Sequence, residues 1–96
     1  MSGDKIEVEN VNTPGRVESV DAAKYGAMKT AMLAVLTGAA PMTAAAIKEA
    51  ALPHLPEDLF PGGATSGWWL KCVQLDLEAK GVVRRHDTKP LTFSLA

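Results

Sequence analysis

The chain has 96 residues, of which 47% are apolar, so it is long enough for one small domain with a modest core. Its formal net charge is −1, and this balance argues against strong nonspecific binding to nucleic acid, which usually needs a basic excess. A single cysteine, Cys72, excludes an intramolecular disulfide and every metal site built from several cysteines.

The first 20 residues are predicted to form an extended N-terminal segment ahead of a domain over residues 21–96. Ile6 and Val8 alternate with glutamates, which is a weak strand signal, and residues 13–15 read Thr-Pro-Gly, a turn. A helix is predicted over residues 22–36, because Asp21 suits the N-cap and the apolar side chains that follow recur at helical spacing.

A second helix is predicted over residues 44–52, with Thr43 as its cap and Pro53 as its end. A long connection rich in proline and glycine follows over residues 54–66. A third helix is predicted over residues 67–80, where Gly81 suits a left-handed position and Val82 can pack back in a Schellman motif. Val82 and Val83 begin one predicted strand, which continues through residue 85, and apolar residues alternate over 91–95, so a hairpin with a loop over 86–90 is predicted.

Three helices followed by a two-stranded hairpin resemble a winged helix, an α+β variant of the helix-turn-helix. The run LEAKGVVRRH, followed by PLTFSLA, resembles the end of a recognition helix and a wing. The whole chain also resembles a family of small uncharacterised bacterial proteins through its GWWLKCVQLDLEAKGVV segment. The first resemblance implies a three-helix core with a C-terminal two-stranded β-hairpin, and the second implies no activity. The connection 54–66 departs from the tight turn of a simple helix-turn-helix.

The predicted third helix carries a narrow polar strip that includes Lys71, Gln74 and Glu78. In a DNA-binding winged helix, Lys71 and Gln74 would contact bases in double-stranded DNA, and Arg84, Arg85 and Lys89 would contact phosphates. Two alternatives need no DNA. In the first, the polar strip is only the solvated side of the helix. In the second, the charged residues of the hairpin only keep an edge strand soluble.

Trp68 and Trp69 cannot both face the core, because neighbouring helical residues point about 100° apart. One is expected in the core. The other either packs under the N-terminal segment or is an exposed anchor for a protein partner, since tryptophan is enriched at interfaces. An exposed patch of Trp68 and Leu75 would favour a protein-interaction module, with a homodimer as one form of it.

No catalytic constellation is visible, so we expect neither an enzyme nor a cofactor. His54 and His86 lack a third ligand, which argues against a metal site. Cys72 lies among apolar residues and is expected to be buried and inert. The polar N-terminus and the absence of a long apolar run predict a cytoplasmic protein that does not enter membranes. Two functions therefore remain open: a DNA-binding regulator and a protein-interaction module.

Overall fold

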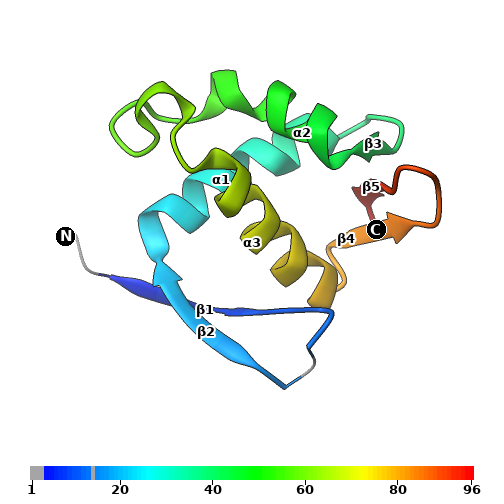
Figure 1. Cartoon of the computed structure of the whole chain (residues 1–96), viewed down its shortest axis with the longest axis horizontal. Coiled ribbons are helices and arrows are strands. Elements are labelled where there is room, and N and C mark those ends of the chain that lie inside the picture. The colour runs from blue at the N-terminus through cyan, green and yellow to red at the C-terminus, as the bar shows by residue number, and fades with distance from the viewer. Residues whose placement is uncertain (1–3, 14) are drawn as a thin grey trace.

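The computed structural model describes residues 4–13 and 15–96 (Figure 1). This part of the chain contains three α-helices and two small antiparallel sheets, an α+β arrangement. The elements in chain order are β1 (Lys5–Glu9), β2 (Val17–Asp21), α1 (Ala22–Leu36), β3 (Met42–Thr43), α2 (Ala44–Ala51), α3 (Ser66–Ala79), β4 (Val83–His86) and β5 (Thr92–Leu95).

The N-terminal segment is a β-hairpin, where the sequence predicted only an extended lead-in. Strand β1 pairs antiparallel with β2, with Lys5 opposite Asp21 and Ile6 opposite Val20. The hairpin packs against α3 (Figure 1). The side chain of Val8 is buried in the core. The pairing was missed because the loop between the strands is longer than the two-residue turns that mark a hairpin in sequence.

Helix α1 has the bounds that the sequence predicts. The Oδ1 atom of Asp21 accepts hydrogen bonds from the backbone amides of Ala23 and Lys24, at 2.9 and 3.1 Å. These contacts satisfy amide groups that have no partner inside the helix. Met28 and Met32 are fully buried on the face that packs against α2 and α3.

Helix α2 begins where Thr43 caps it, through a 3.2 Å hydrogen bond from the Ala46 amide to Oγ1. It ends at Ala51, but the chain continues through one turn of 3-10 helix, Leu52–His54. Leu52 keeps helical backbone angles even though Pro53 follows it. The α-helix therefore ends before Pro53, as predicted, and proline fits the first turn of the 3-10 helix because its missing N–H is not needed there.

Helix α3 ends in the predicted Schellman motif. Gly81 has a φ of 75°, in the left-handed region that favours glycine. The Val82 amide donates to the Leu77 carbonyl at 2.9 Å, and the Gly81 amide donates to the Glu78 carbonyl at 3.1 Å. These two bonds are the pair that defines the motif.

The C-terminal sheet has three strands, so the predicted two-stranded hairpin is incomplete. Its order is β3-β5-β4, with Met42 opposite Phe93 and Val83 opposite Leu95. Strand β3 has only two residues, too few to show alternation in the sequence. It joins the segment before α2 to the end of the chain.

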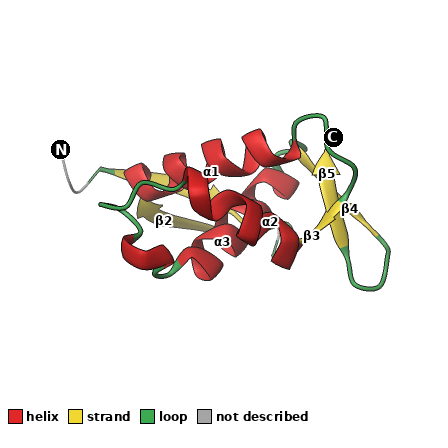
Figure 2. Ribbon diagram, turned by 90° about the horizontal axis from the view of Figure 1, so that it is seen from above, coloured by secondary structure: helices red, strands yellow, loops and turns green. Residues whose placement is uncertain are grey.

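The helices lie beside the β3-β5-β4 sheet, which is at one end of the molecule, and they cover the β1-β2 hairpin, which passes behind them in Figure 2. Their apolar faces form one core, which also takes Phe60 from the connection before α3. Val83 and Phe93 close the core at the sheet end, and Val8 closes it at the hairpin. This arrangement places α3 at the centre, in contact with α1, α2, β1 and β4.

Candidate functional site: two cavities along helix α3

The middle of α3 is covered on every side. Each residue of the segment 73–77 is at most 9% exposed. Five successive helical residues point around a full turn, since each steps by about 100°. No face of this segment is therefore open to a large partner, and the exposed side chains of α3 lie before it, as far as Lys71, or after it, at Ala79.

Gln74 does not lie on a solvated strip, as the sequence suggested. It is 6% exposed, and its Nε2 donates to Glu78 Oε2 at 3.1 Å. Glu78 also accepts from Nε and a terminal nitrogen of Arg85, at 2.8 and 3.2 Å. The sheet that covers Gln74 is formed by distant segments, so helical geometry alone could not reveal its burial.

The other residues suggested for DNA contacts are exposed. Lys71 lies on the first half of α3, Arg84 on β4 and Lys89 in the loop after it. Lys71, Gln74 and Arg85 line one cavity together, and the structure does not bring Arg84 or Lys89 into that lining. The lining of this cavity therefore includes three of the five residues suggested for DNA contacts.

Trp68 and Trp69 point in different directions, as the geometry of a helix requires. Trp69 is in the core, and Trp68 is 59% exposed. Their rings meet edge to face, with centroids 4.9 Å apart and planes at 79°. Leu75 is buried, so the predicted exposed patch of Trp68 and Leu75 is wrong as to Leu75.

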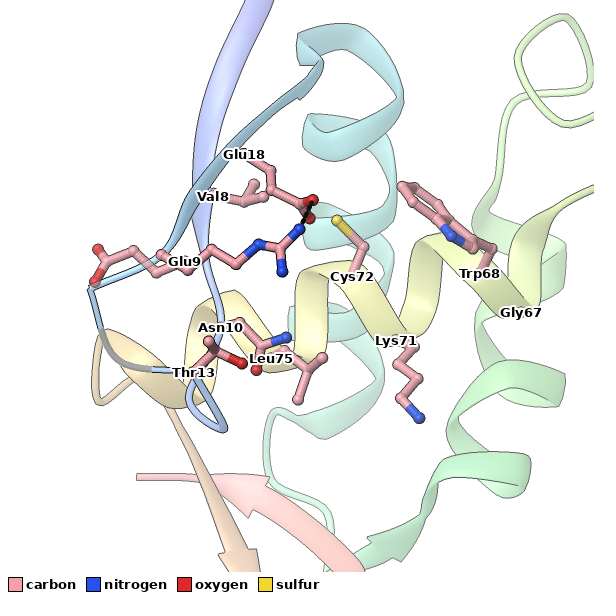
Figure 3. A pocket seen from close by; sticks show the side chains of 11 residues that line it. Val8, Glu9, Asn10, Thr13, Glu18, Gly67, Trp68, Lys71, Cys72 and Leu75 are labelled. Atoms are coloured by element: carbon pink, nitrogen blue, oxygen red, sulfur yellow. Dashed lines mark hydrogen bonds and ion pairs between the residues drawn. The ribbon is translucent and has the colours of Figure 1, made fainter.

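Trp68 and Leu75 both line a cavity of about 370 Å³ between α3 and the N-terminal hairpin, here named the Trp68 cavity (Figure 3). Val8 and Cys72 contribute further apolar surface to it. Its rim is polar, with Glu18 and Lys71 among the charged residues. An apolar interior with a polar rim is the usual composition of a binding pocket.

Cys72 faces the hairpin in the Trp68 cavity, on the side of Glu18 (Figure 3). It is half-buried, more accessible than the sequence predicted. Burial raises the pKa of the thiol to about 11, and the negative charges of Asp76 and Glu18 act in the same direction. The thiol is therefore protonated near neutral pH and is a poor nucleophile.

A second cavity, of about 620 Å³, lies on the other side of α3, against α2 and the β3-β5-β4 sheet. We name it the basic groove, because Lys48, Lys71 and Arg85 line it. Leu70, Leu75, Leu91 and Phe93 supply much of its apolar wall. Gly67, Lys71 and Leu75 line both cavities, so the part of α3 over residues 67–75 separates them.

A model of the Family of unknown function (DUF6958) matches residues 5–93, nearly the whole chain. The chain belongs to this family. No curated protein and no solved structure matches it. The match spans the hairpin, all three helices and most of the second sheet, so both cavities lie within the DUF6958 region.

The DUF6958 chain also holds a buried carboxylate that the sequence analysis missed. Asp76 is 0% exposed and accepts hydrogen bonds from the Tyr25 hydroxyl, from Lys80 Nζ at 2.9 Å and from the Glu9 amide at 2.8 Å. Burial alone would raise the pKa of Asp76, but these donors outweigh it and hold the pKa below its ordinary value. Its position between Leu75 and Leu77 was the available signal, because a charge inside an apolar run needs buried partners.

Asp76 ties the hairpin to the helical core, because its donors come from β1, α1 and α3. Burial, together with the same carboxylate, raises the pKa of the Tyr25 hydroxyl far above its ordinary range, so that group stays protonated. All the partners of Asp76 are internal, which indicates a structural role.

Among residues 4–13 and 15–96, no group of three or more histidine, cysteine or acidic side chains could hold a metal ion. Within the same ranges, every helix is too short or too polar to cross a lipid bilayer.

Proposed function

We propose that this chain is a winged-helix protein that acts as a protein-interaction module through the Trp68 cavity. The fold assignment is supported by the order α1, β3, α2, α3, β4, β5, in which three helices are followed by a two-stranded wing and β3 completes the sheet. The N-terminal hairpin is an addition to that plan, and it supplies one wall of the cavity.

The observation that carries the proposal is the contrast along α3. Its middle is enclosed, whereas Trp68 near its start is largely exposed at the edge of an apolar cavity. Because residues 73–77 are enclosed, the surface that α3 offers to a partner is concentrated in its N-terminal part, around Trp68 and Lys71. A large exposed aromatic side chain beside a pocket is the usual composition of an interface anchor.

Trp68 is also well placed to bind with little loss of side-chain freedom. Its ring rests edge-on against buried Trp69, a geometry that aromatic pairs favour. A side chain that is already ordered loses less entropy when a partner covers it. The rim charges of Arg16, Glu18 and Lys71 would remain at the border of such an interface.

Photo-crosslinking tests this proposal directly. A benzoylphenylalanine at position 68, expressed in the native cells, should give a discrete crosslinked product whose partner mass spectrometry identifies. The same probe at Glu49, an exposed residue on α2 outside both cavities, is the control. Crosslinking to a second copy of the chain would identify a homodimer. Equal, diffuse labelling at both positions would contradict the proposal.

DNA binding is the second candidate, because Lys71, Arg84 and Lys89 are exposed cations. With the middle of α3 enclosed, such binding would use phosphate contacts from the wing. An amide NMR titration with a random DNA duplex, first at low and then at physiological salt, tests it. Shifts at residues 84–89 that fade with salt and disappear in Arg84→Glu would favour DNA; no shifts at low salt would remove this candidate.

A further inference from the structure

We propose that the basic groove binds an acidic peptide segment of a partner protein, with one or two large apolar side chains in the groove and carboxylates on its rim. This site differs from the Trp68 cavity, since α2 and the β3-β5-β4 sheet form its other walls. The inference stands whether or not Trp68 contacts a partner.

The apolar wall of the groove comes from two separate parts of the chain. Leu70 and Leu75 belong to α3, and Leu91 and Phe93 lie at the end of the chain. Leu91 is among the exposed large apolar side chains of the described residues. A volume of about 620 Å³ is in the usual range for a ligand pocket, and is large enough for one or two large side chains.

The charges around the groove have one sign. Lys48 and Lys71 line it, no carboxylate is part of its lining, and neither lysine forms an ion pair within residues 4–13 and 15–96. The positive charge of Arg85 is largely neutralised by its ion pair with Glu78. In the Trp68 cavity, by contrast, Glu9 and Glu18 offset the cations. Electrostatic attraction therefore favours binding of an acidic ligand in the basic groove over binding in the Trp68 cavity.

The two lysines come from different helices that approach closely. Lys48 Nζ lies 3.7 Å from the position that a Cβ atom on Gly67 would occupy, so the α2 lysine reaches the start of α3. The groove also includes Ala44 and Ala45 in the first turn of α2. Helix N-termini carry partial positive charge, which adds to the attraction of the lysines for a carboxylate.

The observations favour a peptide over nucleic acid. A phosphate backbone would leave Leu91, the exposed residue of the apolar wall, uncovered, whereas a leucine or phenylalanine side chain would bury it. The net charge of −1 also repels a long polyanion, but it is a small barrier to a short segment that contacts the lysines directly.

Selection from a display library of random 12-residue peptides against the purified full chain tests the inference. The selected peptides should be enriched in aspartate and glutamate around leucine or phenylalanine. A fluorescent copy of the most enriched peptide then gives a dissociation constant by polarisation. NMR shifts on binding should appear at Thr43, Leu91 and Phe93, which line the groove but not the Trp68 cavity.

Charge reversal provides the matched controls. Lys48→Glu and Lys71→Glu should each weaken binding of the selected peptide by about tenfold, because each replaces attraction with repulsion. Lys5→Glu, on exposed β1 outside both cavities, makes the same change in net charge and should leave the affinity unchanged. Circular dichroism of each variant checks that the fold persists.

Several outcomes would overturn the inference. They are enrichment without acidic residues, equal loss of affinity in Lys5→Glu, or a DNA duplex that displaces the peptide and depends on Lys48. Dimerisation lost only in Lys48→Glu would assign the groove to a second copy and would overturn it too. Trp68→Ala should retain peptide binding, so failure of the Trp68 proposal and failure of this one give different results.

Discussion

At the scale of single residues, Asp76 is the side chain whose removal has the clearest expected effect. Replacement by asparagine removes the charge that Tyr25, Lys80 and the Glu9 amide all contact. We expect Asp76→Asn to lower the free energy of unfolding by about 2 kcal/mol, since hydrogen bonds to a buried charge are among the stronger ones. Urea denaturation measures the change.

Glu49→Gln is the control for that substitution. It makes the same chemical change at an exposed position on α2, where we expect a change within about 0.5 kcal/mol. Equal stability of Asp76→Asn and Glu49→Gln would mean that the buried carboxylate contributes nothing to folding.

The lowered pKa of Asp76 also predicts how stability depends on pH. A carboxyl whose pKa is lower in the folded state stabilises the fold above its unfolded value, and this contribution is lost as pH falls through the folded pKa. We therefore expect wild-type stability to decline below about pH 4. The urea midpoint of Asp76→Asn, measured from pH 7 to pH 2, should decline less; parallel curves would refute this assignment.

Cys72 should react slowly with alkylating reagents at neutral pH, although it borders a cavity. Its pKa is raised to about 11, so the thiolate fraction near pH 7 is very small. Mass spectrometry after iodoacetamide treatment should show modification that accelerates as pH rises toward 10. A rate at pH 7 equal to that of free cysteine would contradict the raised pKa.

At the scale of elements, two glycines allow opposite predictions for the same substitution. Gly81 has a positive φ, so Gly81→Ala strains the end of α3 and should cost about 1 kcal/mol. Gly26 lies inside α1, and a Cβ atom there meets nothing within 4 Å. Gly26→Ala should therefore stabilise the protein by about 0.5–1 kcal/mol. Thermal unfolding of both variants tests these predictions. A change in unfolding temperature of the same sign in both variants would contradict the argument.

The elements also show why sequence predicted some parts of this fold and not others. The bounds of α1 and the end of α3 follow from local signals, the Asp21 cap and the Gly81 turn. The pairing of β3 with β5 and the burial of Gln74 depend on segments distant along the chain. Asp76 shows the same limit, since its partners Glu9 and Tyr25 lie 67 and 51 residues away.

The candidate sites follow the same division. Trp68 was predicted as one of two possible anchors because neighbouring helical residues must diverge, and its exposure agrees with that geometry. Lys48 was not singled out, since only the folded structure brings α2 beside the start of α3. Both cavities are formed by elements that are separated in the chain, so no motif marks them.

At the scale of the whole molecule, the N-terminal hairpin is the part that should open first. Strands β1 and β2 pair only with each other within the described residues, and their outer surface is exposed. Their links to the rest include Val8 in the core, Ile6 and Val20 packed half-buried against it, and the bond from the Glu9 amide to Asp76. Few buried contacts mean that a segment can open without global unfolding.

Native-state hydrogen exchange tests this expectation. Amides of β1 and β2 should exchange faster than those of the buried part of α3. Asp76→Asn should increase the exchange rates of the hairpin amides more than those of residues 28–32 in α1. Because the hairpin forms a wall of the Trp68 cavity but contributes only Asn12 to the basic groove, its release should disturb the first site far more than the second. Asp76→Asn could instead increase exchange equally in the hairpin and in α1 and weaken binding equally at both cavities. The molecule would then open as one unit, and opening of the hairpin alone would not affect the Trp68 cavity.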